Sequence, residues 1–432
     1  MILPGIHPQR VLLNDEVHAR PPEPMASPAR LSYLALLCGA EEREASFQAV
    51  CALARTCGVA PPEPGDSHFS ADLFAFRIKW ERHTEFVRFT FFVAGVTEDL
   101  FARTALAAVP EAWVRGLPGQ VMMAAHLVLL PGGEDAMAVG ERLFPREALV
   151  GALMADRSGA AFTDFRIYPD GFSRIVLQDR GMTPWQAGRV AQRLLEIDTY
   201  RMMALLALPV AQALGPVIAR CEQELARITA AMVTAAEADE PVLLDRLTRL
   251  AAEIDSRQAD NLYRFSAAVA YDDIVQRRIA ELREERIAGL QTLQEFTERR
   301  MQPAMNTCRS VAARQEELSR RVARATQLLA TRVGVTRERR SQGLLAAMNR
   351  RVKQQLQLQS TVEGLSIAAV TYYVVGLIGH GAEGLNAAGV RVEPAVAMGV
   401  SIPIVAVLIA LALRRVRRAV TRKSAVVGDG DG

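Results

Sequence analysis

The sequence predicts an α+β cytoplasmic domain, followed by long coiled-coil-like helices and a C-terminal transmembrane hairpin of two helices. Stretches with alternating apolar residues, typical of strands, lie between about residues 66 and 180. From Thr183 onward the apolar residues recur with the period of an α-helix. Near the end, two apolar segments, 365–379 and 395–413, are the strongest candidates for membrane spans.

These patterns divide the 432 residues into five segments. They are a proline-rich segment with a helix (1–65), a small α/β domain (66–182), a long-helix stalk region (183–361), the hairpin (362–413, with spans of about 362–380 and 395–413) and a basic cytoplasmic tail (414–432). The formal net charge of +3 gives no reason to expect a nucleic-acid partner. The five cysteines form no C-x-x-C pair, so free thiols in a reducing cytoplasm are expected.

The N-terminal half alternates between proline-rich breaks and short elements. Its first apolar stretch, 32–56, predicts a helix with its apolar face inward. Two aromatic and β-branched runs, 73–80 and 86–92, are separated by a polar turn and predict a hairpin. A short strand is predicted at 126–130, and a second hairpin at 162–177 around a Pro-Asp-Gly turn.

The helical half begins at Thr183, which can cap a helix that has Pro184 in its first position. This helix is expected to stop at Pro209, and a single helix is expected from 242 to 300. The next helix is expected to be interrupted near Gly334 and to continue into the first span. Its heptad-like apolar series is Val311, Leu318, Val322, Ala325 and Leu329.

The hairpin carries an orientation signal. The second segment has no charge over about 19 positions, enough to cross a hydrocarbon core of about 30 Å. Lysine and arginine cluster at 350–353 and 414–423, whereas the loop holds Arg391 alone, so both chain ends are expected in the cytoplasm. This indicates a multi-pass protein of the cytoplasmic (inner) membrane. The expected anchor residues are Leu365, Tyr372, Gly376, Gly379, Pro403, Arg414 and Arg415.

The rest of the chain is expected to be water-soluble. Its helices have charged faces, and long charge-free runs are expected only beyond Val362. Residues 1 to about 340 should therefore be soluble when expressed alone. The alternative interpretation of the hairpin is a buried helical pair in a large soluble core.

The densest polar set lies near the N-terminus. His7, Glu16 and His18 are candidate metal ligands, since imidazole and carboxylate groups commonly bind metals. Their spacing matches no defined zinc or iron site. The competing interpretation is structural, with polar side chains that pin an irregular segment to the α/β domain.

Two acidic pairs lie on predicted helices. Glu196 and Asp198 are two positions apart and do not converge, so a solvated or interhelical face is expected. Asp272 and Asp273 are expected on a solvated face, with a cation at an interface as the alternative. No phosphate-binding loop, dinucleotide fingerprint or nucleophile elbow is present. The sequence therefore predicts no catalytic residue, no cofactor-binding residue and no enzyme.

The loop between the spans offers one further candidate site. Glu383 and Asn386 are candidates for the mouth of a pore, where an acidic ring attracts a divalent cation such as magnesium. Glycine and acidic residues are also what any short external loop contains. The pore and the plain loop are therefore both retained.

Several stretches together carry a family resemblance. They are His7-Pro8, 14–22 (Asn-Asp-Glu-Val-His-Ala-Arg-Pro-Pro), 165–168 (Phe-Arg-Ile-Tyr), 192–201 (Gln-Arg-Leu-Leu-Glu-Ile-Asp-Thr-Tyr-Arg) and 357–365 (Gln-Leu-Gln-Ser-Thr-Val-Glu-Gly-Leu). On these stretches the chain resembles a bacterial family of membrane-anchored proteins of unknown function. The resemblance covers nearly the whole chain and implies no activity.

The order of the segments resembles the plan of the CorA-type divalent-cation channels. That family has Gly-Met-Asn at the end of its first span, and the nearest match here is Gly384-Leu385-Asn386, expected beyond the helix end. The resemblance implies a homo-oligomer in the lipid bilayer whose first spans line an axis. The alternative is a membrane-anchored cytoplasmic scaffold or sensor without transport activity. An enzyme in the α/β domain is the third hypothesis.

Overall fold

The computed structural model describes residues 5–11, 13–14, 21–387, 389 and 393–427. The chain divides into two compact units, Met1–Leu328 and Leu329–Gly432. The first unit holds a mixed α/β sheet domain and packed helices, and the second holds the end of one long helix and the last helix. A sheet domain followed by long helices is therefore confirmed.

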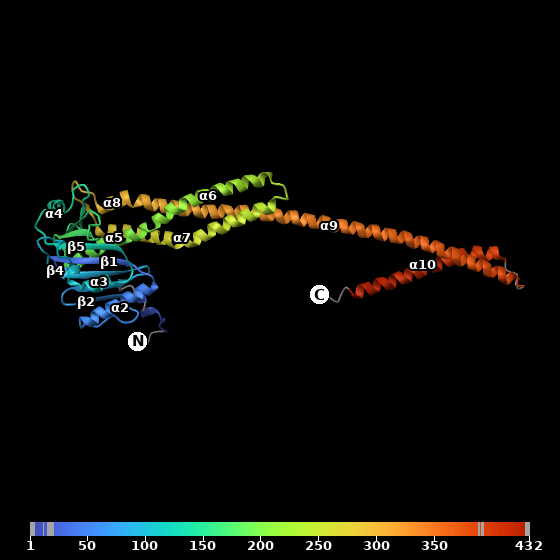
Figure 1. Ribbon diagram of the computed structural model, residues 1–432, viewed down its shortest axis with the longest axis horizontal. Coiled ribbons are helices and arrows are strands. Elements are labelled where there is room, and N and C mark those ends of the chain that lie inside the picture. Colours follow the sequence, from blue (N-terminus) through green and yellow to red (C-terminus); the bar gives the residue numbers. More distant parts are fainter. Residues whose placement is uncertain (1–4, 12, 15–20, 388, 390–392, 428–432) are drawn as a thin grey trace. The chain divides into compact units, whose positions relative to one another are not determined.

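Within the described residues, nine strands form one sheet (Figure 1). They are β1 (Ala29–Leu37), β2 (His68–Asp72), β3 (Arg77–Arg82), β4 (Phe86–Ala94), β5 (Gln120–Leu130), β6 (Val150–Met154), β7 (Gly159–Thr163), β8 (Ser173–Asp179) and β9 (Glu285–Arg286). Their order is β2-β3-β4-β1-β5-β8-β7-β6-β9. β5 and β8 pair in parallel, and the other described pairs are antiparallel.

The central strand β1 corrects the expectation of one helix over 32–56. The helix α2 (Ala40–Thr56) begins only after Gly39. The prediction is wrong because the apolar run of β1 is buried on both faces of the sheet, and such a run cannot be distinguished from a buried helix by periodicity. Leu34 packs in the core beneath α2, while the Tyr33 hydroxyl lies on the opposite face.

Both predicted hairpins are present. β3 and β4 pair antiparallel with Trp80 opposite Phe89. β7 and β8 also pair antiparallel, and Tyr168 N donates to Phe172 O at 3.0 Å across the Pro-Asp-Gly turn. β7 is shorter than predicted, because Phe165 has a φ of 53° and cannot continue the strand.

Helices cover both faces of the sheet. One face carries α2, the short 3₁₀ helix η1 (Ala105–Ala108), α3 (Glu111–Arg115) and α4 (Ala136–Leu143). Its core is aromatic, and Trp113 of α3 makes an edge contact with Phe89 at 5.7 Å between ring centroids. The other face of the sheet is covered by α5 (Pro184–Leu205). This second face carries the charged residues discussed below.

α5 begins as predicted, because the Thr183 side chain accepts a hydrogen bond from Gln186 N at 3.3 Å. α6 (Ala207–Thr234) follows after a one-residue interruption, so the predicted stop at Pro209 is wrong. Pro209 lies in the first turn of α6, where a missing N–H breaks no helical hydrogen bond.

The predicted helix over 242–300 is two helices, α7 (Glu240–Leu282) and α8 (Leu293–Arg300). α7 ends where Arg283 adopts a left-handed conformation with a φ of 49°. The chain then forms β9, which pairs with β6 at the edge of the sheet. The helical spacing of apolar residues continues through this region of the sequence. That spacing therefore did not indicate the turn at Arg283.

α9 (Gln302–Ala387) passes Gly334 without a break, so the predicted interruption is wrong. A glycine in a helix costs only about 1 kcal/mol relative to alanine, which a helix of this length tolerates. The helix continues into the first apolar segment as predicted. It also includes Gly384-Leu385-Asn386, which therefore does not lie beyond the helix end. α10 (Pro394–Val427) completes the described chain.

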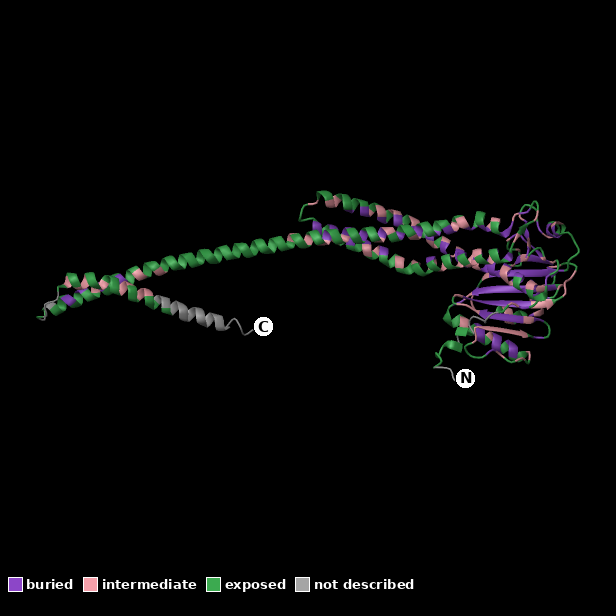
Figure 2. Cartoon of the chain, turned by 180° about the vertical axis from the view of Figure 1, so that it is seen from behind, coloured by how far each residue is buried: buried purple, intermediate pink, exposed green. Residues whose placement is uncertain are grey.

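In the first unit, α6, α7 and the first part of α9 lie side by side (Figure 1). Ion pairs connect them, such as Arg314 of α9 with Glu222 of α6 at 2.8 Å. Most of the predicted apolar seam is buried here, namely Leu243, Leu247, Leu250 and Ile254 of α7 and Val311, Leu318, Val322 and Ala325 of α9. In Figure 2, buried and exposed positions alternate along these helices.

Three described helices are long and apolar enough to cross a membrane: Pro184–Thr234, Gln302–Leu385 and Pro394–Ala412. The first corrects the expectation that charge-free runs occur only beyond Val362, because no charge lies between Arg201 and Arg220. The most apolar stretches of these helices, called the apolar windows below, differ in how much of them the protein buries. One third (33%) of the first window is buried within the protein, against 11% and 6% of the other two.

Candidate functional site

A cluster of buried charges lies between the sheet and α5. The buried charge cluster comprises Lys79 and Glu81 of β3, Arg88 of β4, Glu196 of α5 and Arg278 of α7. Arg88 is its centre. Its Nη2 donates to Glu81 Oε1 at 2.7 Å, and its Nη1 donates to Glu196 Oε1 at 3.1 Å. One guanidinium therefore joins a carboxylate of the sheet to a carboxylate of the covering helix.

Strand alternation brings these groups together. Glu81 and Arg88 are direct partners across β3 and β4, and successive residues of a strand point to opposite faces. The apolar neighbours, such as Trp80, pack beneath α2, so the charged residues must face α5. The side chains of Glu81, Arg88 and Glu196 are 2%, 4% and 5% exposed, and such charges require partners.

The hydrogen bonds within the cluster satisfy both carboxylates. Glu196 Oε1 also accepts from Gln192 Nε2 at 2.8 Å, and its Oε2 accepts from Arg278 Nε at 2.6 Å. Lys79 Nζ lies 3.3 Å from Glu81 Oε1. Of the two faces expected for Glu196, solvated or interhelical, the structure shows the interhelical one, because Arg278 of α7 faces it. The neighbouring Arg193 pairs with Glu281 of α7.

The electrostatics keep the cluster ionised. Burial alone would raise the pKa of Glu81, but Arg88 and then Lys79 hold that pKa below its usual range. Burial opposes ionisation of Glu196 in the same way, and Arg88 and Arg278 lower its pKa. Burial lowers the pKa of Lys79, while Glu81 acts against this shift. The acids are therefore charged at neutral pH and have no proton to donate in catalysis.

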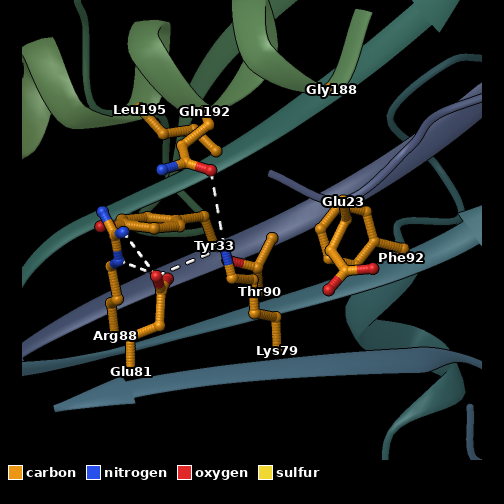
Figure 3. A pocket seen from close by; sticks show the side chains of 10 residues that line it. All are labelled: Glu23, Tyr33, Lys79, Glu81, Arg88, Thr90, Phe92, Gly188, Gln192 and Leu195. Atoms are coloured by element: carbon orange, nitrogen blue, oxygen red, sulfur yellow. Dashed lines mark hydrogen bonds and ion pairs between the residues drawn. The ribbon is translucent and has the colours of Figure 1, made fainter. Parts of the chain in front are cut away.

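A small cavity opens beside the cluster (Figure 3). Its volume is about 20 Å³, which is room for about one water molecule and far too little for a substrate, since ligand pockets span about 300–1,000 Å³. It is lined by Glu23, Tyr33, Lys79, Glu81, Arg88, Thr90, Phe92, Gly188, Gln192 and Leu195. The arrangement supports the packing of α5 on the sheet and offers no space for chemistry on a ligand.

The cluster also holds the segment that leads into β1. Lys79 Nζ donates to the Pro21 carbonyl oxygen at 2.6 Å, and Arg77 Nε forms an ion pair with Glu23 Oε2 at 2.8 Å. Gly188 of α5 allows the close approach, because a Cβ there would lie 1.8 Å from the Glu23 carbonyl oxygen. The structural role predicted for the N-terminal segment therefore has support at residues 21–23.

Replacing Gly188 by alanine is expected to displace this segment. The added methyl group would meet backbone atoms of Glu23, which cannot move aside as a flexible side chain would. We expect a loss of about 1–3 kcal/mol in unfolding free energy, and faster proteolysis near residue 23. Gly334 of α9 is the matched control, because it is also helical and has nothing within 4 Å of its Cβ position. Gly334→Ala should instead stabilise by about 0.5–1 kcal/mol, and equal effects of both changes would contradict the close-packing argument.

The predicted metal ligands are not brought together in the described part of the chain. His7 is exposed, and its Nδ1 accepts a hydrogen bond from Gln9 N at 3.2 Å. Glu16 and His18 lie outside the described residues, so the site remains a prediction. Among the residues that the structure describes, no group of three or more His, Cys, Asp or Glu side chains is placed to hold a metal ion.

Asp272 of the second acidic pair has a cationic partner of its own. It is 1% exposed, and its Oδ2 pairs with Arg309 of α9. Its Oδ1 accepts from Gln302 Nε2 at 3.0 Å. The expectation of a solvated face is wrong for Asp272, because α9 covers it, and it holds for the exposed Asp273. All five cysteines are free, as predicted.

The predicted anchor residues lie on α9 and α10 of the second unit. Gly379 allows the two helices to approach, because a Cβ there would lie 2.5 Å from Met398 Sδ of α10. Gly376 and Tyr372 line an open groove of about 590 Å³ between the helices. Leu365 and Tyr372 are 68% and 77% exposed. Pro403 lies inside α10.

The remaining predicted positions lie near the helix ends. Arg414 and Arg415 belong to α10, and Arg415 is exposed. Asn386 lies on the helical backbone of α9, and its side chain is outside the description. The Glu383 side chain is 64% exposed, with His380 Nδ1 at 3.4 Å from its Oε2. The pore-mouth assignment of Glu383 and Asn386 therefore remains a prediction.

The charged residues of the sheet were not among the candidate site residues predicted from the sequence. The available signal was the alternation in β3 and β4, where Lys79 and Glu81 on one strand are matched by Arg88 on the next. Charges of opposite sign at every second position of adjacent aromatic strands indicate a polar face that a further element covers. The sequence did not reveal that the helix carrying Glu196 covers this polar face.

One comparison with known proteins gives a match. A family model described as "Protein of unknown function (DUF3422)" matches residues 5–420. The resemblance to a family of unknown function is thereby confirmed over nearly the whole chain, and the comparison gives no support for a CorA-like channel. No curated protein and no solved structure matches the chain.

Proposed function

The chain belongs to the DUF3422 family of proteins of unknown function, and we propose that it is a membrane-anchored cytoplasmic scaffold without transport activity. The observation that carries this proposal is the exposure of large apolar side chains on the helices of the second unit. On α9 these include Leu365, Tyr372, Tyr373 and Leu377, and on α10 they include Val400, Ile404, Leu408 and Leu411. In water such a surface is unfavourable, whereas in lipid it is the ordinary surface of a spanning helix.

The orientation follows from the basic residues. Arg350, Arg351 and Lys353 precede the first span, and the arginines that begin at Arg414 follow the second. The positive-inside rule then places both chain ends in the cytoplasm and the short connection between α9 and α10 outside. The bilayer of the inner membrane is the partner of this hairpin, and the sheet domain faces the cytoplasm.

The buried charge cluster of the first unit supports a structural role rather than a catalytic one. Its central polar groups form closed pairs around Arg88, and its adjoining cavity holds about one water molecule. A catalytic site needs titratable groups that converge on space for a substrate. In this proposal the domain offers its outer surface to partners, and the hairpin keeps that surface at the membrane.

Transport is the competing function, and Glu383 allows a direct test of it. In liposomes that contain the purified protein, we expect no uptake of magnesium, cobalt or nickel ions above that of empty liposomes. Because Glu383 is mostly exposed, Glu383→Gln is expected to leave both flux and membrane insertion unchanged. Uptake by the folded protein that falls in Glu383→Gln would replace the scaffold with an acidic pore mouth that attracts cations.

A further inference from the structure

The strand β2 forms one edge of the sheet (Figure 1). Its ladder with β3 fixes which backbone groups point outward. Arg82 N donates to Ser67 O at 2.7 Å and Leu73 N donates to Phe76 O at 2.8 Å, so the odd-numbered residues bond to β3. In an antiparallel ladder the bonding residues alternate. The N–H and C=O groups of His68, Ser70 and Asp72 therefore point away from the sheet.

Of the common devices against edge pairing, this strand lacks lysine, proline and a bulge, and it carries one charged residue, Asp72. Edge strands are commonly blunted by lysine, proline or a bulge. β2 has the sequence His-Phe-Ser-Ala-Asp, and its pairing with β3 is regular over all five residues. Phe69 and Ala71 point into the core, which leaves the three outward backbone positions on a flat, regular strand.

We propose that β2 pairs antiparallel with β2 of a second copy of this chain, about a two-fold axis at Ser70. This register is the one that uses the full strand. It places Ser70 opposite Ser70 and, on either side, His68 opposite Asp72. All three outward residues then form hydrogen-bonded pairs, each of which exchanges two backbone hydrogen bonds. The two sheets become one continuous sheet.

Charge complementarity selects a second copy as the occupant. His68, Ser70 and Asp72 share one face of the strand, because their β3 partners Glu81, Lys79 and Arg77 alternate with the core residues. Opposed side chains in a ladder lie close enough to interact directly. An imidazole N–H donates to a carboxylate in either protonation state of histidine. The two-fold axis creates this His68–Asp72 pair twice, so the strand is complementary to itself.

The turn beside β2 exposes a large apolar side chain. Phe74 has a φ of 68°, and its side chain is 92% exposed. Ala75 N donates to Leu73 O at 2.9 Å, which makes a three-residue turn of the strained type. A bulky residue in this conformation is strained. Phe74 directly follows the last residue of β2, so its exposed ring lies beside the proposed pairing.

The test uses the full chain in mild detergent and two changes at His68 that leave Asp72 and its turn intact. His68→Asp places two carboxylates opposite each other at both ends of the pairing. His68→Lys preserves an opposite charge. We expect wild type and His68→Lys to form dimers of similar affinity, measured by light scattering across a concentration series. His68→Asp should raise the dissociation constant by about tenfold or more.

Hydrogen exchange identifies the interface and separates it from association through the hairpin. The amides of His68, Ser70 and Asp72 should become protected as concentration rises in wild type, and should remain unprotected in His68→Asp. Ser70→Pro removes an outward N–H that β3 does not use, and should likewise abolish the concentration-dependent protection. Unchanged circular dichroism and thermal melting show that the variants are folded.

Three outcomes overturn the proposal. The first is a wild-type chain that stays monomeric at every concentration. The second is a dimer for which His68→Asp and His68→Lys have equal affinity, which would place the contact elsewhere. The third is protection of the β2 amides that does not depend on concentration or that requires a different protein, which would give the edge another occupant. None of these results bears on membrane anchoring, so the scaffold proposal is tested separately.

Discussion

Arg88→Ala is expected to destabilise the sheet domain by about 3–5 kcal/mol, because it leaves the buried carboxylates of Glu81 and Glu196 facing each other. This loss is a large part of the stability of an ordinary domain, about 5–15 kcal/mol. The expected result is a large fall in the denaturant concentration at the midpoint of unfolding. Circular dichroism on the full chain in detergent measures this midpoint.

Arg115→Ala provides the matched control. Arg115 also pairs with a glutamate, Glu111, but the two side chains are 78% and 77% exposed. Water screens such a pair, so its loss should have little effect on stability. Equal destabilisation by the two variants would contradict the claim that burial of the charges makes the cluster essential.

The pH dependence of stability gives a second measure of the same cluster. The pKa values of Glu81 and Glu196 are lowered in the folded protein, so the unfolded chain binds more protons at acidic pH. Their contribution is fully present above the usual glutamate pKa of about 4.5 and is lost as the pH falls through the lower folded values. Arg88→Ala should remove this contribution and flatten the acid limb of the stability profile.

Removal of residues 341–432 is expected to transfer the protein from the membrane to the soluble fraction. The deletion removes both windows that are least buried within the protein, at 11% and 6%. The remaining apolar window, in α5 and α6, packs against neighbouring helices, and 33% of it is buried. Its buried residues include Leu214 and Ile218, so insertion into lipid would require the helices of the first unit to separate.

A shorter deletion is the matched control for this prediction. Removal of residues 416–432 takes away most of the basic tail but keeps α9 and the apolar part of α10. This variant should remain in the membrane fraction, because the apolar spans, rather than the basic tail, supply the transfer free energy. A soluble protein after the short deletion would indicate attachment through electrostatic contact with anionic lipid.

The sequence predicted those parts of the fold that depend on local signals. The Thr183-Pro184 helix start, the hairpin turn with Gly171 and the buried series from Val311 to Ala325 follow from capping, turn chemistry and periodicity, and all are present. β1 was mistaken for a helix because a strand buried on both faces has no alternating pattern to read.

The candidate site depends on contacts far apart in sequence. Glu81 and Arg88 meet across a predicted hairpin and were within reach of sequence analysis. Glu196 lies 108 residues from Arg88, and Arg278 lies 82 residues from Glu196. No local pattern defines how the helices that carry Glu196 and Arg278 pack. The same limit applies to the first of the three apolar helices, because its charge-free stretch between Arg201 and Arg220 is compatible with lipid or with protein.

The most direct test of the scaffold account is alkaline extraction of membranes from cells that express either the full chain or residues 1–340. The account predicts that the full chain resists extraction and stays with the lipid, while the shorter chain is recovered folded in the soluble fraction. Retention of residues 1–340 in the extracted membrane would contradict the account, because it would assign Pro184–Thr234 to the bilayer and remove the first unit from the cytoplasm.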